Sequence, residues 1–418
     1  MNLHADLRHV IYALSDALDL VGVDDVAHGK RVGIMAAECG RVDGQGERET
    51  AFLFDLGMLH DIGVSSTRTH CNLVEKFDWD GSQVHCEVGY ALLKSFVPFE
   101  AMALPVRYHH TRWELLVKLD VPPATMRQAN LIYLVDRVDA LAAPHYADNS
   151  LLLATDEIRG KIVEHSGTYF SPELVALFLE ASRTEAFWLM LEPRSIQARL
   201  IDLLAQGHDY PATVDDLKRL GAIFARIVDA KSPFTAEHSV GVARLARLLA
   251  ERLGVSAANC DKLEIAGLLH DLGKLRVPDE ILDKPGRLDT RERKIINTHS
   301  YETFQILRNI QGFEEVTRWA AYHHEEPDGS GYPFHLTADA MPLEARILRV
   351  ADIFQAMVQR RPYRKGLGDD EVAAFMRQLA DDGRIDRSVA NALLADVAAA
   401  RAAACPPAAD LPEVGLAA

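Results

Sequence analysis

Histidine spacing constrains the fold of this chain more than any other feature of its sequence. In each half, five histidines follow one plan: 32 positions separate the first from the second, and 24 separate the third from an adjacent closing pair. They are His28, His60, His85, His109 and His110 in the first half, and His238, His270, His299, His323 and His324 in the second. Ten of the 17 histidines therefore fall at matched places, which random scatter would not produce. A repeat at nearly constant offset indicates two copies of one domain.

Other matched positions extend the repeat across both halves. They are Leu7 with Leu217, Asp136 with Asp352, and Gly167 with Gly383. Apolar residues recur at three-to-four spacing through most of the chain, in segments such as VARLARLLAERL, and this periodicity is typical of amphipathic helices. We therefore predict an all-α fold with two tandem helical domains, residues 1–195 and 213–400.

Two further segments break the helical pattern. Gly207 and Pro211 interrupt the stretch between the copies, so a linker is expected at residues 196–212. Residues 401–418 are mostly small and contain prolines, without periodicity, and we expect a disordered tail there.

Composition narrows the classes of function. The formal net charge of −16 argues against binding to nucleic-acid polymers or anionic membranes. No apolar run is long enough to span a bilayer, and the first residues read as an amphipathic helix, so we expect a cytoplasmic protein. The five cysteines show no CxxC spacing, which argues against a disulfide framework or a thiolate zinc site.

The second copy carries a set of candidate metal ligands made of imidazoles and carboxylates. Such donors suit Fe, Mn, Ni, Co or Zn rather than Ca or Mg. A single buried histidine is more often a core residue, but seven positions recurring together favour a ligand set. The set exceeds one tetrahedral site and fits two ions bridged by Asp271, an arrangement that clamps phosphodiesters. The seven are His238, His270, Asp271, His299, His323, His324 and Asp352.

Three features near these ligands could contact a substrate. Lys274 follows the His270–Asp271 pair by one turn, and a solvated lysine is the alternative. The loop EEPDGSGYP at 325–333 is a turn or a wall of the site. The segment RRPYR at 360–364 is either a solvated basic patch or a guanidinium site for phosphate.

Taken together, these motifs resemble the HD-GYP family of cyclic dinucleotide phosphodiesterases. The matching segments are HDLGK (270–274), THSYETFQIL (298–307), HHEEPDGSGYP (323–333), MPLEARILRVADIFQAM (341–357) and RPYR (361–364). The resemblance implies two tandem domains of the helical HD superfamily, a two-metal site that often holds iron, and hydrolysis of cyclic di-GMP to pGpG or GMP. Some members of this family hydrolyse 3′,3′-cyclic GMP-AMP instead, and the sequence does not decide between the two.

The resemblance also implies roles for individual residues. The seven positions above would be metal ligands, and Asp271 and Lys274 would be catalytic. Substrate contacts would come from Lys274, Gly331, Tyr332, Pro333, Arg361 and Arg364. Members with three metals carry a glutamate four positions before the first histidine, where this chain has Phe234. We therefore expect two metals, because phenylalanine cannot ligate and Glu237 would face another direction on a helix.

The first copy keeps the metal-ligand positions but not the substrate-binding motifs. Val64 replaces the lysine, HHTRWELL replaces the GYP loop, and residues 145–148 replace RPYR. We therefore predict a divergent HD-type domain that regulates the second. A third ligand set that includes Asp24 is conceivable, as are a structural metal, another phosphoester substrate and an empty site. The candidate ligands are His28, His60, Asp61, His85, His109, His110 and Asp136.

Two other functions compete with hydrolysis. The second domain could bind a cyclic dinucleotide without cutting it, or both domains could be helical scaffolds without metal. A homodimer is a possible assembly, although no heptad run fixes it.

Overall fold

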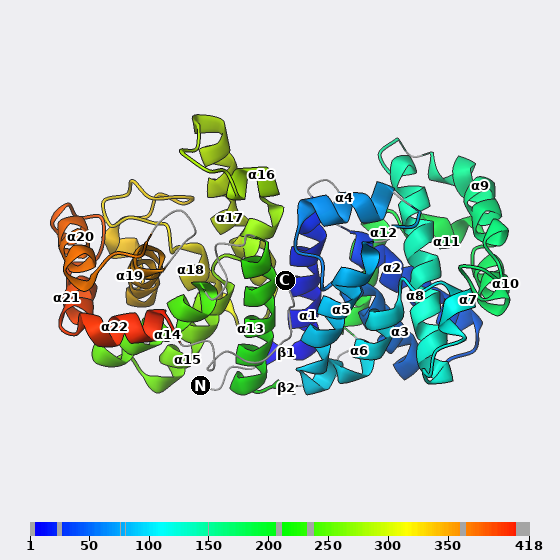
Figure 1. Cartoon of the computed structure of the whole chain (residues 1–418), viewed down its shortest axis with the longest axis horizontal. Coiled ribbons are helices and arrows are strands. Elements are labelled where there is room, and N and C mark those ends of the chain that lie inside the picture. Colours follow the sequence, from blue (N-terminus) through cyan, green and yellow to red (C-terminus); the bar gives the residue numbers. More distant parts are fainter. Residues whose placement is uncertain are drawn as a thin grey trace. The chain divides into compact units, whose positions relative to one another are not determined.

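The computed structural model describes residues 5–22, 27–75, 77–79, 81–148, 150–205, 211–231, 238–359 and 365–406. Helices make up almost all of the regular structure (Figure 1), which confirms the predicted all-α class. The chain forms two compact units. We call residues 24–208 the N-terminal unit, and residues 1–23 together with 209–413 the C-terminal unit. Among the described residues, no helix combines the length and the apolar character needed to cross a membrane.

The N-terminal unit is built around α8, whose central residues are buried on every side. Helix α2 packs against α3 and α8, and α6 packs against α5 and α8. The elements are α2 (His28–Val42), α3 (Glu47–Leu59), α4 (Thr67–Glu75), α5 (Ser82–Lys94), η2 (Val97–Phe99), α6 (Glu100–Tyr108), α7 (Trp113–Leu116), α8 (Pro123–Ala142), η3 (Ala143–His145), α9 (Leu151–Glu164), α10 (Pro172–Ala181), α11 (Glu185–Leu189) and α12 (Pro193–Ala205).

The C-terminal unit repeats this plan, with α14, α15, α17, α18 and α19 at the positions of α2, α3, α5, α6 and α8. Helix α14 packs against α15 and α19, as α2 packs against α3 and α8. The elements are β1 (Ala5–Asp6), α1 (Leu7–Asp19), η1 (Leu20–Gly22), β2 (Pro211–Ala212), α13 (Val214–Ala230), α14 (His238–Arg252), α15 (Ala257–Leu269), η4 (Leu272–Arg276), α16 (Asp279–Leu282), α17 (Thr290–Leu307), α18 (Glu314–Ala321), η5 (Ala338–Ala340), α19 (Leu343–Val358), α20 (Asp369–Asp381), α21 (Arg387–Leu394) and α22 (Val397–Ala404).

The first helix lies in a different unit from the one that the sequence led us to expect. Residues 1–195 were expected to form one domain, but residues 1–23 group with 209–413. Strand β1 pairs antiparallel with β2, and α1 packs against α17 and η4. The periodicity of α1 predicts an apolar face that must be buried, but it does not specify which helices cover that face.

The first residues of the predicted disordered tail are helical instead. The predicted disordered tail starts at residue 401, yet α22 continues to Ala404. Ala400 and Ala404 are buried, and a Cβ added at Gly241 of α14 would lie 2.1 Å from the carbonyl oxygen of Ala404. This close packing orders the helix despite its low-complexity sequence. The remainder of the predicted tail, from residue 407, lies outside the described residues.

Candidate metal centre

Five helices of the C-terminal unit bring the seven predicted ligands together. His238 begins α14, His270 and Asp271 follow α15, His299 lies in α17, the pair at 323–324 follows α18, and Asp352 lies in α19. Except for half-buried His324, these residues are buried. Their ligand atoms form overlapping groups, each with members within 4.8 Å of one another. The groups are His238–His270–Asp352, His299–His323–His324 and His270–Asp271–His323.

Asp271 lies between the two outer groups and turns one carboxylate oxygen toward each. Its Oδ2 lies 3.4 Å from Nε2 of His238 and 3.3 Å from Nε2 of His270. Its Oδ1 lies 3.5 Å from Nε2 of His299 and 3.8 Å from Nε2 of His323. This is the geometry of a carboxylate that bridges two cations.

Hydrogen bonds at Nδ1 orient four of the five imidazoles so that Nε2 faces the centre. His270, His299 and His323 donate from Nδ1 to the carbonyl oxygens three residues earlier, at 2.7, 2.6 and 2.6 Å. His238 donates to Oε1 of Gln355 at 2.6 Å. Such outer partners fix the tautomer of a metal ligand.

Two buried atoms at the centre of this cluster lack a hydrogen-bond partner. They are Nε2 of His270 and Oδ1 of Asp271. Leaving a buried polar atom unpaired costs about 1–3 kcal/mol. A metal ion between these atoms would satisfy both, so the residues present fit the predicted pair of ions.

Burial keeps several of the imidazoles neutral. It lowers the pKa of His299 to about 4 and holds the pKa values of His323 and His324 well below their usual range. A neutral imidazole is the form that ligates a metal. These three side chains are therefore in the required protonation state near pH 7.

The carboxylates carry negative charge at the centre. Burial alone would raise the pKa of Asp271, but the charges of His270 and Lys274 hold that pKa well below its usual range. Burial alone would lower the pKa of His238, but Asp271 and Asp352 raise it to about 10. The cluster therefore attracts positive charge, which a metal ion can supply in place of the proton.

The predicted substrate contacts lie beside this cluster where the structure describes them. Nζ of Lys274 lies 2.5 Å from Oδ2 of Asp271. The ring of Tyr332 stacks on His324, with 4.8 Å between the centroids, and the peptide bond to Pro333 is cis. Four of the residues singled out in the sequence of this half, Phe234, Glu237, Arg361 and Arg364, lie outside the described residues.

The loop with the GYP motif is held by two acidic side chains whose roles the sequence did not reveal. Buried Glu325 accepts hydrogen bonds from the backbone N–H groups of Phe334 at 2.6 Å and Leu336 at 2.8 Å. Glu326 pairs with Arg384 at 2.8 Å and Arg349 at 2.8 Å. The available signal was two adjacent acids in a loop expected to flank the metal ligands, since buried carboxylates require partners.

The N-terminal unit brings its own predicted ligands together. Its groups are Asp61–His85–His109–His110 and His28–His60–Asp61. Asp136 lies beside them, with Oδ1 3.4 Å from Nε2 of His28. Val64, at the position of Lys274, is buried. Asp24 lies outside the described residues.

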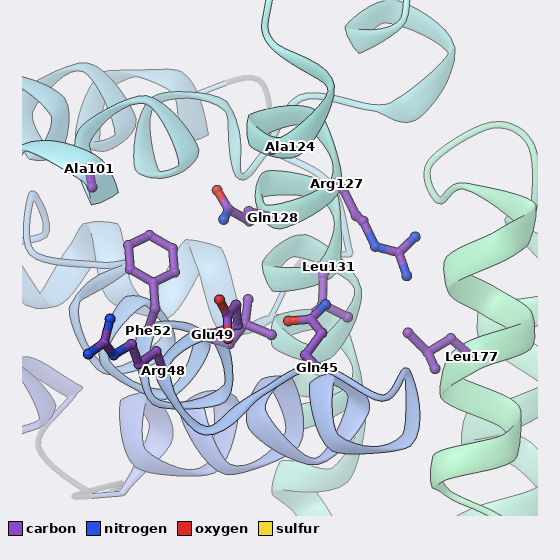
Figure 2. A pocket seen from close by; sticks show the side chains of 11 residues that line it. Gln45, Arg48, Glu49, Phe52, Ala101, Ala124, Arg127, Gln128, Leu131 and Leu177 are labelled. Atoms are coloured by element: carbon purple, nitrogen blue, oxygen red, sulfur yellow. The ribbon is translucent and has the colours of Figure 1, made fainter.

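A separate pocket of about 540 Å³ lies in the N-terminal unit on helices α3, α6, α8 and α10 (Figure 2). Phe52, Leu53, Leu131 and Leu177 give it an apolar lining. Arg127 at its edge is paired with Asp43 and Glu173. None of the residues that line it belongs to the histidine clusters.

Comparisons with known proteins place the chain among phosphodiesterases. The HD domain family model matches residues 222–389. The 3′3′-cGAMP-specific phosphodiesterase 1 of Vibrio cholerae is 37% identical over 402 residues, which cover 94% of this chain and 92% of that protein. The cyclic di-GMP phosphodiesterase response regulator RpfG of Xanthomonas campestris is 38% identical over 173 residues, 41% of this chain and 45% of its own.

A solved structure matches the chain over nearly the same extent. It is the crystal structure of the cyclic GMP-AMP specific phosphodiesterase V-cGAP3 of Vibrio cholerae. The TM-score is 0.65 at 26% sequence identity, and the match covers 94% of this chain and 98% of that one. Both halves of the chain therefore have counterparts in this structure and in the first relative.

Proposed function

Because the chain belongs to the HD-GYP family of cyclic dinucleotide phosphodiesterases, we propose that it hydrolyses 3′,3′-cyclic GMP-AMP at the metal cluster of the C-terminal unit. The observation that carries the hydrolytic role is the position of Asp271, with one oxygen facing each group of imidazoles. A scaffold would not require such a bridging geometry.

The proposed substrate, 3′,3′-cyclic GMP-AMP, was the alternative in the sequence analysis, where cyclic di-GMP was the main expectation. The relative that matches nearly the whole chain is named for 3′3′-cGAMP, whereas RpfG, named for cyclic di-GMP, matches 41% of it. These matches support the mixed dinucleotide as substrate and leave cyclic di-GMP as the second candidate.

The chain would hold two divalent transition ions with His238, His270, Asp271, His299, His323, His324 and Asp352. A bound pair supplies Lewis acidity and activates water at neutral pH. The donor set suits iron, which the family resemblance favours, as well as Mn, Ni, Co or Zn.

The remaining residues bind and orient the substrate. Lys274, with a side chain 23% exposed, neutralises a nonbridging phosphate oxygen when the phosphodiester approaches Asp271. Tyr332 offers an aromatic ring beside His324, against which a purine can lie. Glu325 fixes the backbone after Tyr332 and thereby keeps this ring in place.

We assign a regulatory role to the N-terminal unit, because it has no GYP loop and has Val64 at the position that matches Lys274. A regulatory unit should change turnover when it is altered, even though the catalytic side chains are intact. Comparing initial rates of the full chain with and without the substitutions His60→Ala and Asp61→Ala measures this effect.

The decisive experiment offers both dinucleotides to the full chain reconstituted with ferrous or manganous ion. Chromatography should show a linear product from 3′,3′-cyclic GMP-AMP at a higher rate than from cyclic di-GMP. The double variant His270→Ala, Asp271→Ala should give no product. Faster cleavage of cyclic di-GMP would overturn the substrate assignment, and binding without any product would identify a receptor instead.

A further inference from the structure

We infer that the N-terminal unit holds a second pair of divalent transition-metal ions, in a centre of its own bridged by Asp61. The matching family model begins at residue 222 and does not reach this cluster. The inference therefore rests on the geometry of the N-terminal unit and does not depend on the substrate proposed above.

Asp61 divides its carboxylate between two groups of imidazoles. Its Oδ1 lies 3.2 Å from Nε2 of His85 and 3.6 Å from Nε2 of His109. Its Oδ2 lies 3.6 Å from Nε2 of His60 and 3.9 Å from Nε2 of His28. Asp271 makes the same division in the C-terminal unit, so both units present a bridging carboxylate.

Asp136 completes the arrangement by spanning the two groups from the other side. Its Oδ1 lies 3.4 Å from Nε2 of His28, and its Oδ2 lies 3.8 Å from Nε2 of His110. Buried Arg137 pairs with Oδ2 at 2.9 Å. Oδ1 of Asp136 is therefore left to face the imidazoles.

The imidazoles of two predicted ligands are held with Nε2 pointing inward. His60 and His109 donate from Nδ1 to the carbonyl oxygens of Gly57 at 2.7 Å and Val106 at 2.6 Å. Nε2 of His60 and Oδ1 of Asp61 are buried without a hydrogen-bond partner. The same two atoms are unpartnered in the C-terminal unit, at His270 and Asp271.

The outer partner of His28 is a carboxylate that two other side chains hold in place. Its Nδ1 lies 2.8 Å from Oδ2 of Asp139, which occupies the position of Gln355 three residues after the matched aspartate. Arg31 donates to Asp139 from Nε at 2.6 Å, and Tyr146 donates to it from its hydroxyl at 2.7 Å. A carboxylate that accepts from a ligand histidine makes the imidazole a stronger donor to a metal.

Packing of histidine rings alone does not account for this cluster. Ring contacts such as His60–His109, at 5.3 Å between centroids, would leave Nε2 of His60 and Oδ1 of Asp61 unpaired. Each such buried atom costs about 1–3 kcal/mol. Cations of the imidazole- and carboxylate-binding class, Fe, Mn, Ni, Co or Zn, remove that cost.

The N-terminal centre is accessible to ions but lacks the substrate-binding lysine. The side chain of Asp61 is 18% exposed, compared with 3% for Asp271, which Lys274 contacts. Val64 provides no such contact. We therefore assign metal binding to this centre without cleavage of a cyclic dinucleotide.

Metal analysis of the full chain tests the inference without depending on activity. The variant Asp271→Asn with His270→Ala, loaded with Mn²⁺ and desalted, should retain about two ions per chain. Adding His60→Ala and Asp61→Asn should remove them. Loss of all metal from the first variant, with helical circular dichroism unchanged, would overturn the inference.

A milder variant guards against misfolding. Asp139→Asn should weaken Mn²⁺ binding to the N-terminal centre about 10–100-fold, as removal of an outer carboxylate typically does. Cys86→Ser, which places the residue found at matched position 300 beside His85, should leave affinity unchanged. Equal Mn²⁺ affinities of the unaltered chain, the Asp139→Asn variant and the Cys86→Ser variant would argue against the centre. A failure of the proposed hydrolysis would give a different result from a failure of this inference, because metal would be bound while no product formed.

Discussion

At the scale of single residues, Lys274 distinguishes the proposed catalytic cluster from the N-terminal cluster. Its ammonium lies 2.5 Å from the bridging carboxylate of Asp271, whereas Val64 stands at the matched position. We expect Lys274→Met to lower kcat/KM for the cyclic dinucleotide about 10²–10³-fold, the usual cost of removing one charge-stabilising donor. Metal content should not change, because lysine is not a ligand. Initial rates and metal analysis of one preparation check both statements, and Lys284→Met, which alters a pair with Glu292, is the control.

Gly331 shows how a single position can fix a loop. A Cβ there would lie 2.2 Å from the backbone nitrogen of Glu326 and 2.4 Å from Cα of Glu325, so Gly331→Ala must displace the loop. Tyr332 would then leave His324, and we expect KM to rise about tenfold, which corresponds to about 1.4 kcal/mol. Gly368→Ala is a matched control, since its Cβ would meet no atom closer than 3.5 Å. An unchanged KM in the first variant would show that Tyr332 does not contact substrate.

At the scale of elements, helix α21 depends on Asp386, the N-cap residue that precedes it. Asp386 accepts hydrogen bonds from the backbone N–H groups of Ser388 at 2.8 Å and Val389 at 3.1 Å. Burial alone would raise the pKa of Asp386, but hydrogen bonds from the Ser388 hydroxyl and the Val389 N–H, together with Arg346, lower that pKa overall. Asp386→Ala should reduce the free energy of unfolding by about 1 kcal/mol near pH 7.

This loss should depend on pH with a definite sign. A carboxyl whose pKa is lower in the folded state stabilises the fold above its unfolded pKa of about 3.9. The contribution disappears as the pH falls through the lower folded value. The difference between wild type and Asp386→Ala in denaturant titrations should therefore shrink below about pH 4. Asp386→Asn, which retains a capping oxygen, should lose less than the alanine variant.

At the scale of the whole molecule, the first helix belongs to the unit that contains the proposed catalytic site. Leu14 is 1% exposed in α1, and this helix packs against α17 and η4, the element that carries Lys274. Leu14→Ala should cost about 2–5 kcal/mol, because it opens a cavity in a packed core. Hydrogen exchange should speed up in α17 and η4 while α8 stays protected. Faster exchange confined to α8 would assign α1 to the other unit.

The sequence alone determined the all-α class, the duplication and the residues that converge at each cluster. These follow from helical periodicity and from side-chain chemistry, which are local properties of the chain. The comparisons confirmed the family resemblance. The sequence could predict it because the motifs that carry it, from HDLGK onward, are read directly in the sequence. The motifs led us to expect cyclic di-GMP first, whereas the comparisons give better support to the alternative, 3′,3′-cyclic GMP-AMP. The motifs could not order the two substrates, because the proposed metal ligands and phosphate contacts do not read the bases.

Only the tertiary structure decided which helices bury α1, which partners orient the imidazoles and which residues hold the GYP loop. An amphipathic pattern states that a face is buried but not against what. Gln355, Asp139 and Glu325 act through contacts across many positions of the chain, such as the 2.6 Å bond between His238 and Gln355. Distances of that kind arise only when the helices pack, so spacing along the chain could not predict them.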